Sequence, residues 1–327
     1  MGGIAVAGTI LVDNIYETSV YPKAGELTKI LSTQRAVGGC VPNVAIDLKR
    51  LSPSLPVYAV GKIGDDEEGS FVRGAMAQAG VDTSGVKMAN DRTSFTAVIS
   101  CVGGQRTFFT YGGANDSFEY GDVDFDSLCE NHGIDHLHLG YFLLLDKIDG
   151  GDGEKILAEA KRRGIRTSVD LVSDAESGYE KIIPALKYVD DIIINETEAG
   201  GLAKMRPSAE NLRDIAEKIM SYGVRERVVI HMPEVGVALS KSGFGAVPSY
   251  ALPKSYIKGS TGAGDAFCAG ALIAINRGGN DAEILELGSM AAAASLGAAD
   301  SVSGMKAEEE IKKIFENKKF GRQKLCL

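Results

Sequence analysis

The chain contains 327 residues, of which 44% are hydrophobic and 24% are charged. This balance is typical of a globular protein with a sizeable core, and it excludes disordered and fibrous classes. The formal net charge of −9 excludes a broad basic surface, so we expect no nucleic-acid partner. No apolar run approaches the ~20 residues that cross a bilayer, and the N-terminus lacks a signal-peptide pattern. We therefore expect no membrane partner and a cytoplasmic location.

Short apolar, β-branched runs alternate along the chain with helical patterns. These runs predict buried strands at residues 4–7, 57–60, 136–139, 167–171, 191–194 and 228–230. Among the helix signals, Leu212, Ile215 and Ile219 repeat at helical spacing after the capping residue Ser208. Such alternation predicts an α/β fold with a mostly parallel sheet, in which ligands bind beyond the carboxyl ends of the strands.

Two stretches interrupt this alternation. Residues 26–37 are extended and polar, and residues 93–111 contain two strand patterns around Gly103 and Gly104. The two stretches could pair as a small β lid over a binding site, and an ordinary surface hairpin is the alternative.

The cysteines and histidines give no sign of a metal site. The five cysteines are odd in number and widely spaced, and none forms a C-x-x-C pair. This pattern predicts neither a disulfide framework nor a zinc site. His136 and His138 lie in a strand pattern, and we interpret them as structural side chains.

The strongest motif is the glycine-rich turn at residues 259–265, which precedes a helix that is apolar on nearly all sides. Such a helix must be buried. Its first amides, around Gly262 to Gly264, lie at the positive end of the helix dipole and predict a site for a phosphate. No lysine follows the glycines, so the turn is not a Walker A loop. The alternative is a tight strand-to-helix turn with Asp265 as a first-turn acid.

A second glycine turn, Gly38 and Gly39, precedes a helical pattern with Pro42 and Asn43 in its first turn. Paired glycines allow a ligand to approach the backbone, and the Asn43 amide can donate to and accept from a hydroxyl. A simple turn with Asn43 as a helix cap is the alternative.

Polar residues also follow two predicted strands. Asp13 follows the first strand, and its carboxylate can accept hydrogen bonds from two neighbouring sugar hydroxyls. Asn195 and Glu198 follow the strand at residues 191–194, where Glu198 could hold water on Mg²⁺. The alternatives are an Asp-Asn loop at Asp13 and an exposed acid at a helix start for Glu198.

The order of these motifs resembles that of the ribokinase-like family of sugar kinases, also called the phosphofructokinase B type, over nearly the whole chain. The resemblance depends on five elements that follow one another in the family's order. They are Asp13 after the first strand, Gly38 and Gly39 with Asn43, Gly61 to Asp65 with Gly69, the N-x-x-E element Asn195 and Glu198, and the C-terminal signature Gly262 to Asp265.

This resemblance implies a three-layer α/β fold with a mostly parallel central sheet, helices on both faces and a small β-sheet lid. Residues 1–12, 38–92 and 112–327 would form the main domain, which binds nucleotide and substrate. Residues 13–37 and 93–111 would form the lid, which excludes water from the site.

The resemblance also implies an ATP-dependent sugar kinase, with Asp265 as the base and Mg²⁺ as a cofactor. We favour a primary hydroxyl of a pentose or ketohexose as the acceptor. A carboxylate at a helix N-terminus should be a weak base, which phosphoryl transfer tolerates because it depends mainly on positioning and charge stabilisation. The other implied roles are phosphate binding by Thr261, Gly262, Ala263, Gly264 and Asn195, sugar binding by Asp13, Gly38, Gly39 and Asn43, and Mg²⁺ binding by Glu198 through water.

Two departures from the family pattern leave details open. Gly259 and Ser260 stand where the family usually has Asp-Thr, and that Asp often helps to bind a monovalent cation, so activation by K⁺ stays open. The stretch from His231 to Glu234 differs from the usual nucleotide-side turn, so the adenine contacts stay open as well.

Two other functions remain as alternatives. A nucleoside kinase of the same family would need an aromatic sandwich for the base, which Phe95, Phe109 or Tyr111 could supply. A non-catalytic sugar-binding relative is the second alternative, and the presence of Asp265 argues against it. A small lid sheet with an exposed apolar face would gain by packing on a copy of itself, which favours a homodimer.

Overall fold

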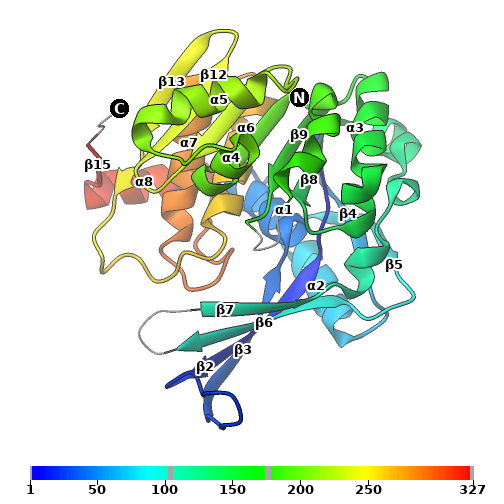
Figure 1. Cartoon of the computed structure of the whole chain (residues 1–327), viewed down its shortest axis with the longest axis vertical. Coiled ribbons are helices and arrows are strands. Elements are labelled where there is room, and N and C mark those ends of the chain that lie inside the picture. Colours follow the sequence, from blue (N-terminus) through cyan, green and yellow to red (C-terminus); the bar gives the residue numbers. More distant parts are fainter. Residues whose placement is uncertain (1, 102–105, 174–177, 325–327) are drawn as a thin grey trace.

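The central sheet of the computed structural model, which describes residues 2–101, 106–173 and 178–324, has nine strands (Figure 1). The strands are β1 (Gly3–Ala7), β4 (Val57–Ile63), β5 (Asp82–Met88), β8 (Ile134–Phe142), β9 (Arg166–Leu171), β10 (Asp191–Asn195), β11 (Arg227–His231), β12 (Val235–Ser240) and β13 (Gly243–Pro248). Their order is β13-β12-β11-β10-β9-β8-β1-β4-β5. All neighbouring strands from β11 to β5 in this order pair in parallel. Strand β12 pairs antiparallel with both β11 and β13. The predicted parallel α/β sheet is confirmed.

Helices cover both faces of this sheet (Figure 1). One face carries α1 (Cys40–Leu51), α2 (Glu67–Gln78), α6 (Ala263–Asn276), α7 (Asp281–Ser295) and α8 (Glu308–Lys318). The other carries α3 (Gly153–Arg162), α4 (Glu196–Ala203) and α5 (Leu212–Met220). Successive side chains of β1 enter the two cores alternately, which explains why its five residues are all apolar or glycine and all buried. As expected from its sequence, α6 is buried from Asp265 to Ile275.

A second, four-stranded sheet projects from the main body (Figure 1). It consists of β2 (Leu11–Thr18), β3 (Ile30–Gly38), β6 (Ser94–Cys101) and β7 (Arg106–Tyr111), in the order β3-β2-β6-β7. Residues 26–37 and residues 93–111 both contribute strands to this sheet, and β2 lies between β3 and β6 and pairs with both. The predicted turn at Gly103 and Gly104 lies outside the described residues.

The sequence pattern did not predict strand β2, because polar residues interrupt the alternation of apolar and polar side chains along it. Asp13 lies within this strand and not in a loop. The short strands β14 (Tyr250–Ala251) and β15 (Gly321–Arg322) form a separate pair near the C-terminus. Among the described residues, no helix is both long enough and apolar enough to span a membrane.

Candidate active site

The glycine-rich turn leads into α6 at the carboxyl ends of β9, β10 and β11. Gly262 has a φ of +78°, and a Cβ at this position would lie only 2.5 Å from the Cβ of Ser301. Glycine alone avoids both the left-handed strain and this clash. The amides of Gly264 and Asp265 lie in the first helical turn, where no preceding turn supplies acceptors. These donors are therefore available to an anion.

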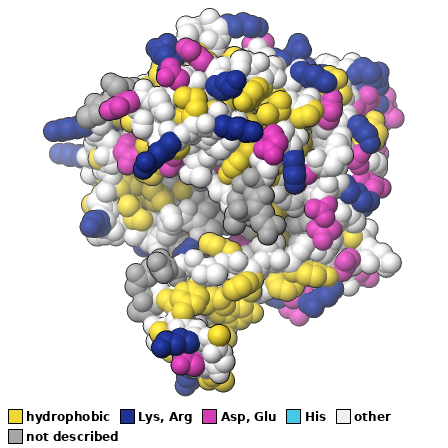
Figure 2. Space-filling view, in the orientation of Figure 1, with side chains coloured by type: hydrophobic (Ala, Val, Ile, Leu, Met, Phe, Trp, Pro, Cys, Tyr) yellow, Lys and Arg dark blue, Asp and Glu magenta, His cyan; other side chains and the backbone are white. Residues whose placement is uncertain are grey.

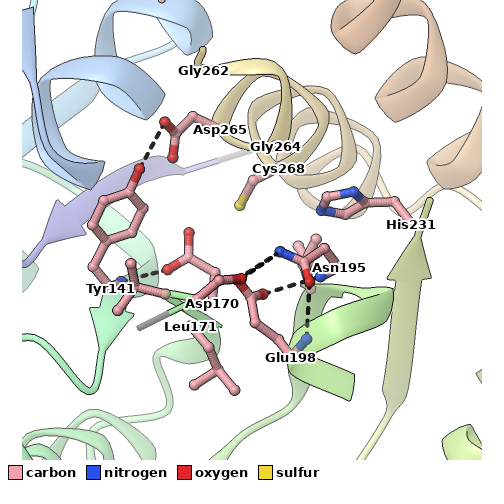
Figure 3. A pocket seen from close by; sticks show the side chains of 13 residues that line it. Tyr141, Asp170, Leu171, Asn195, Glu198, His231, Gly262, Gly264, Asp265 and Cys268 are labelled. Atoms are coloured by element: carbon pink, nitrogen blue, oxygen red, sulfur yellow. Dashed lines mark hydrogen bonds between the residues drawn. The ribbon is translucent and has the colours of Figure 1, made fainter. Parts of the chain in front are cut away.

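The Asp265 side chain is held in place from two sides. Only 5% of this residue is exposed. Its Oδ2 accepts hydrogen bonds from Asn43 Nδ2 at 2.9 Å and from the Tyr141 hydroxyl at 3.0 Å. Together with Gly262 and Gly264, Asp265 lines a cavity of about 240 Å³ (Figure 3). Its Oδ1 accepts no hydrogen bond from the described residues, so this oxygen is available to a ligand.

The environment makes Asp265 a stronger base than its position suggested. Burial raises its pKa to about 8, and the negative charge of Asp170 on the same cavity wall adds to the rise. The hydrogen bonds from Asn43 and Tyr141 lower the pKa by less. Lost solvation therefore opposes the weakening of this base that a helix N-terminus would cause.

The N-x-x-E element forms a reciprocal cap at the start of α4. The Glu198 amide donates to Asn195 Oδ1 at 2.9 Å, and the Glu198 carboxylate accepts from the Asn195 amide at 3.1 Å and from Ser173 Oγ at 2.9 Å. Only 5% of Glu198 is exposed, so the alternative of an exposed acid is wrong. Burial raises its pKa to about 7. Glu198 lines the same cavity as Asp265 and Asp170, and these three carboxylates suit the oxygen preference of Mg²⁺.

Asp13 lies on β2, beside the end of β3. A Cβ on Gly38 would lie 2.7 Å from Asp13 Oδ2, so the carboxylate rests against the Gly38 backbone. Gly39 has a φ of +86°, and a Cβ there would lie 2.6 Å from the Thr9 carbonyl oxygen. Burial raises the pKa of Asp13 to about 7, and the charge of Arg106 opposes this rise. Asp13, Gly38 and Gly39 thus form a compact group, although none of them lines the 240 Å³ cavity.

Asn43 connects this group to Asp265. In addition to its bond to Asp265, its Oδ1 accepts a hydrogen bond from Ser301 Oγ at 2.8 Å. The residue is only 3% exposed. The amide therefore positions the Asp265 carboxylate, a contact that the alternative of a simple helix cap does not explain.

Strand pairing decides which side chains share a face of the small sheet with Asp13. Asp13 pairs with Thr96, which pairs with Thr110, and the two threonine hydroxyls lie 3.2 Å apart. Paired residues project from the same face, and their neighbours in sequence project from the other. The aromatic residues Phe95, Phe109 and Tyr111 therefore lie on the face opposite Asp13. They cannot form a sandwich for a base beside it.

A second cavity, of about 460 Å³, adjoins the first and shares Asn195, His231 and Gly264 with it. Burial lowers the pKa of His231 to about 4, and its neutral ring stacks on Phe267 with the centroids 4.6 Å apart. Apolar side chains form much of the remaining wall, among them Met232, Pro233, Leu252, Ile257 and Leu296. An apolar slot with a few polar groups at one end suits a flat heterocycle joined to a charged tail.

The chain matches the pfkB family of carbohydrate kinases over residues 1–307. It belongs to this family. The protein is accordingly a phosphotransferase of the carbohydrate kinase type, as the order of its motifs implied.

Relatives of this carbohydrate kinase agree with that assignment. The chain is 25% identical to a ribokinase of Arabidopsis thaliana over 321 residues, which cover 96% of this chain and 81% of that protein. It is 24% identical over 303 residues to a 5-dehydro-2-deoxygluconokinase of Clostridium perfringens, with 90% and 88% covered. A solved structure of Arabidopsis thaliana ribokinase complexed with ribose and ATP has a TM-score of 0.82 at 22% identity and covers 97% of this chain and 99% of that chain. This likeness confirms the ribokinase-like fold.

Sequence reasoning missed three side chains at the kinase site. Asp170 is the second-last residue of β9, and Asn195 is the last residue of β10, so a search for polar residues near strand ends could have found it. Tyr141 has a φ of +54°, and its amide donates to Asp170 Oδ1 at 2.5 Å. Arg106 on β7 donates to the Thr261 hydroxyl in the glycine-rich turn. No sequence signal indicates the conformation of Tyr141 or the contact of Arg106.

Proposed function

We propose that this kinase transfers the γ-phosphate of ATP to a primary hydroxyl of a pentose or ketohexose. One observation supports the proposal above all others. The unpartnered oxygen of Asp265 and the first amides of α6 face one cavity, and that cavity opens into an apolar slot large enough for a nucleotide base. A proton acceptor, an anion site and an apolar slot for a base thus adjoin one another.

In the proposed reaction, Asp265 Oδ1 accepts the proton of the sugar hydroxyl as its oxygen bonds to the γ-phosphorus. The bond from that phosphorus to the bridging oxygen of ADP breaks, and ADP leaves. The amides at Gly262, Ala263 and Gly264, with the Thr261 hydroxyl, stabilise the charge on the moving phosphoryl group. Arg106 already donates to Thr261 and adds a positive charge at this point.

The sugar is proposed to bind between the small sheet and α1. Asp13 would accept hydrogen bonds from two of its hydroxyls, and Gly38 and Gly39 would let it approach the backbone. Asn43 would contact the sugar through the amide hydrogen that Asp265 does not use. In this proposal residues 13–37 and 93–111 act as a lid, and residues 1–12, 38–92 and 112–327 form the main domain.

The nucleotide is proposed to occupy the 460 Å³ cavity, with its phosphates toward Asn195 and Gly264. The Arabidopsis thaliana ribokinase structure complexed with ribose and ATP supports the use of ATP. Bound Mg²⁺ would supply charge neutralisation of the phosphates, and Glu198 is placed to hold it through water. Gly259 packs against the carbonyl groups of Ala298 and Ala299 and provides no carboxylate for K⁺, so we leave monovalent-cation dependence to direct assay.

A panel of acceptors tests the substrate class. We expect ATP-dependent turnover with pentoses or ketohexoses, measured by coupled release of ADP, and little turnover with nucleosides. The sugar acid acted on by the Clostridium perfringens relative belongs in the panel, because that relative covers 90% of this chain. Fast turnover of nucleosides without turnover of sugars would reject the proposal. Sugar binding without any turnover would instead indicate a non-catalytic relative.

We also propose that the kinase forms a homodimer through the small sheet. Figure 2 shows hydrophobic side chains gathered on this part of the molecule. Phe109 is 62% exposed, and Leu31 is 54% exposed. Burying such a surface against a second copy removes apolar area from water and protects the edges of the sheet.

Light scattering tests the dimer. The wild-type protein should have twice the mass of one chain, and Phe109→Glu should shift it toward the monomer because a charge would enter the interface. Met88→Glu is the matched control, because Met88 is 54% exposed but lies on β5 of the main sheet. A wild-type monomer at working concentration would exclude the dimer.

A further inference from the structure

A cluster of three potential metal ligands lies next to the 240 Å³ cavity, and one of them, Asp170, lines it. Cys40 is the first residue of α1, His138 lies on β8, and Asp170 lies near the end of β9. All three are buried, and one donor atom from each lies within 4.8 Å of the other two. The phosphate-transfer chemistry described above uses neither Cys40 nor His138.

The distances fit a central metal ion better than they fit hydrogen bonds. His138 Nε2 lies 3.4 Å from Asp170 Oδ2, beyond the 2.7–3.2 Å usual for such a hydrogen bond. Cys40 Sγ lies 3.9 Å from the same oxygen. A tetrahedral Zn²⁺ at ~2.0–2.3 Å from its ligands places neighbouring donor atoms roughly 3.3–3.8 Å apart. The observed spacing therefore needs only small adjustments to hold this ion.

The surrounding groups already orient the donor atoms. His138 Nδ1 is hydrogen-bonded to Ser168 Oγ at 2.9 Å, which directs Nε2 toward the cluster. Asp170 Oδ1 accepts from the Tyr141 amide at 2.5 Å, which leaves Oδ2 for a metal. A Cβ on Gly140 would lie 1.8 Å from Cys40 Sγ, so the glycine provides the space that the thiol occupies.

We propose that Cys40, His138 and Asp170 form a zinc-binding site beneath the active-site cavity. One thiolate, one imidazole and one carboxylate are the donor types that Zn²⁺ prefers, whereas Mg²⁺ prefers oxygen alone. The thiol of Cys268 on α6 lies 3.5 Å from His138 Nε2, but its sulfur is not within 4.8 Å of all three donor atoms, so we do not count it among the ligands. Asp170 and Cys268 also line the cavity, which gives the ion a route of entry.

Zinc at this site would change the electrostatics of the active site. Without metal, burial and the charge of Asp170 raise the pKa of the Cys40 thiol, so it is neutral. Metal binding deprotonates a ligating thiol and brings a compensating positive charge. The ion would also tie α1 to β8 and β9 close to the residues that hold Asp265.

The test uses the full chain after removal of metal with a chelator. We expect it to bind one Zn²⁺ per chain by metal analysis after dialysis, and to bind Zn²⁺ far more tightly than Mg²⁺ in titration calorimetry without nucleotide. Co²⁺ in place of Zn²⁺ should give a thiolate-to-metal charge-transfer band. The cobalt spectrum needs no variant, so it remains informative if a substitution prevents folding. A Co²⁺ spectrum without this band, or no retained Zn²⁺, would overturn the proposal.

Variants assign the ligands. Cys40→Ser should abolish the charge-transfer band and weaken Zn²⁺ binding by more than the roughly 10–100-fold expected for a supporting residue. Ser168→Ala should weaken binding within that range and keep the band, because it only orients His138. Cys129→Ser is the matched control, a partly exposed thiol that does not belong to the cluster, and should bind like wild type. Equal zinc affinity in the Cys40 and Cys129 variants would exclude the site.

Discussion

Asp265→Asn should reduce kcat by about 10²–10⁴-fold, the usual contribution of a positioned general base. Asparagine keeps the shape of the side chain but cannot accept the proton of the sugar hydroxyl. Its amide oxygen can still accept from Asn43 and Tyr141, so the dissociation constant for the sugar should change only a few-fold. Coupled measurement of ADP release gives kcat, and titration calorimetry gives the affinity for the sugar.

Loss of folding would not explain such a result. Because the pKa of Asp265 is raised to about 8 in the folded protein, ionisation costs stability as the pH rises from the ordinary carboxyl value toward 8. Asparagine has no such cost, so the melting temperature at pH 8 should not fall. Asp82→Asn removes an exposed charge and should keep wild-type turnover. Undiminished turnover by Asp265→Asn would remove its assigned role.

Gly262→Ala should lower kcat by about 10²–10³-fold, the loss that follows removal of one donor from an anion site. The new methyl group would lie 2.5 Å from Ser301 Cβ and 2.7 Å from the Ser301 carbonyl oxygen. Backbone atoms at this distance cannot give way cheaply, so the turn must shift and carry its amides off the phosphate. A further ~1–2 kcal/mol of left-handed strain falls on the same residue. Steady-state kinetics and thermal unfolding measure the two effects separately.

Gly278→Ala is the matched control for Gly262→Ala. Gly278 has a φ of +75°, nearly that of Gly262, but no atom lies within 4 Å of a Cβ placed there. The control should therefore lose similar stability through strain and keep its turnover. If both variants lost turnover equally, the effect would come from strain in the fold and not from the position of the amides.

Local patterns were enough to predict most of the central sheet. The run at residues 192–194 is apolar because β10 is buried on both faces, so its burial can be predicted from the sequence. The helix after Gly264 is apolar on all sides for the same reason. Strand β2 has no continuous apolar run, because it is partly open to solvent and carries Asp13.

The candidate site was predicted only where a residue follows a strand or starts a helix. Asn195, Glu198 and Asp265 occupy such positions, so their types and places along the chain indicated their roles. Tyr141 and Arg106 do not, since each reaches the site through a contact with a segment more than 100 residues away in the sequence. No rule based on residue spacing predicts a contact between segments so far apart in the sequence.

The sequence by itself determined the layered α/β fold and the glycine turn that opens α6, because each depends on burial or backbone geometry within a short segment. The family was indicated by the resemblance of its motif order, which runs along nearly the whole chain. Only the tertiary structure decided the strand order of the small sheet, the raised pKa of Asp265 and the meeting of Cys40 with His138 and Asp170. These features arise from packing between distant segments, where lost solvation and close approach depend on neighbours that the chain brings together only when it folds.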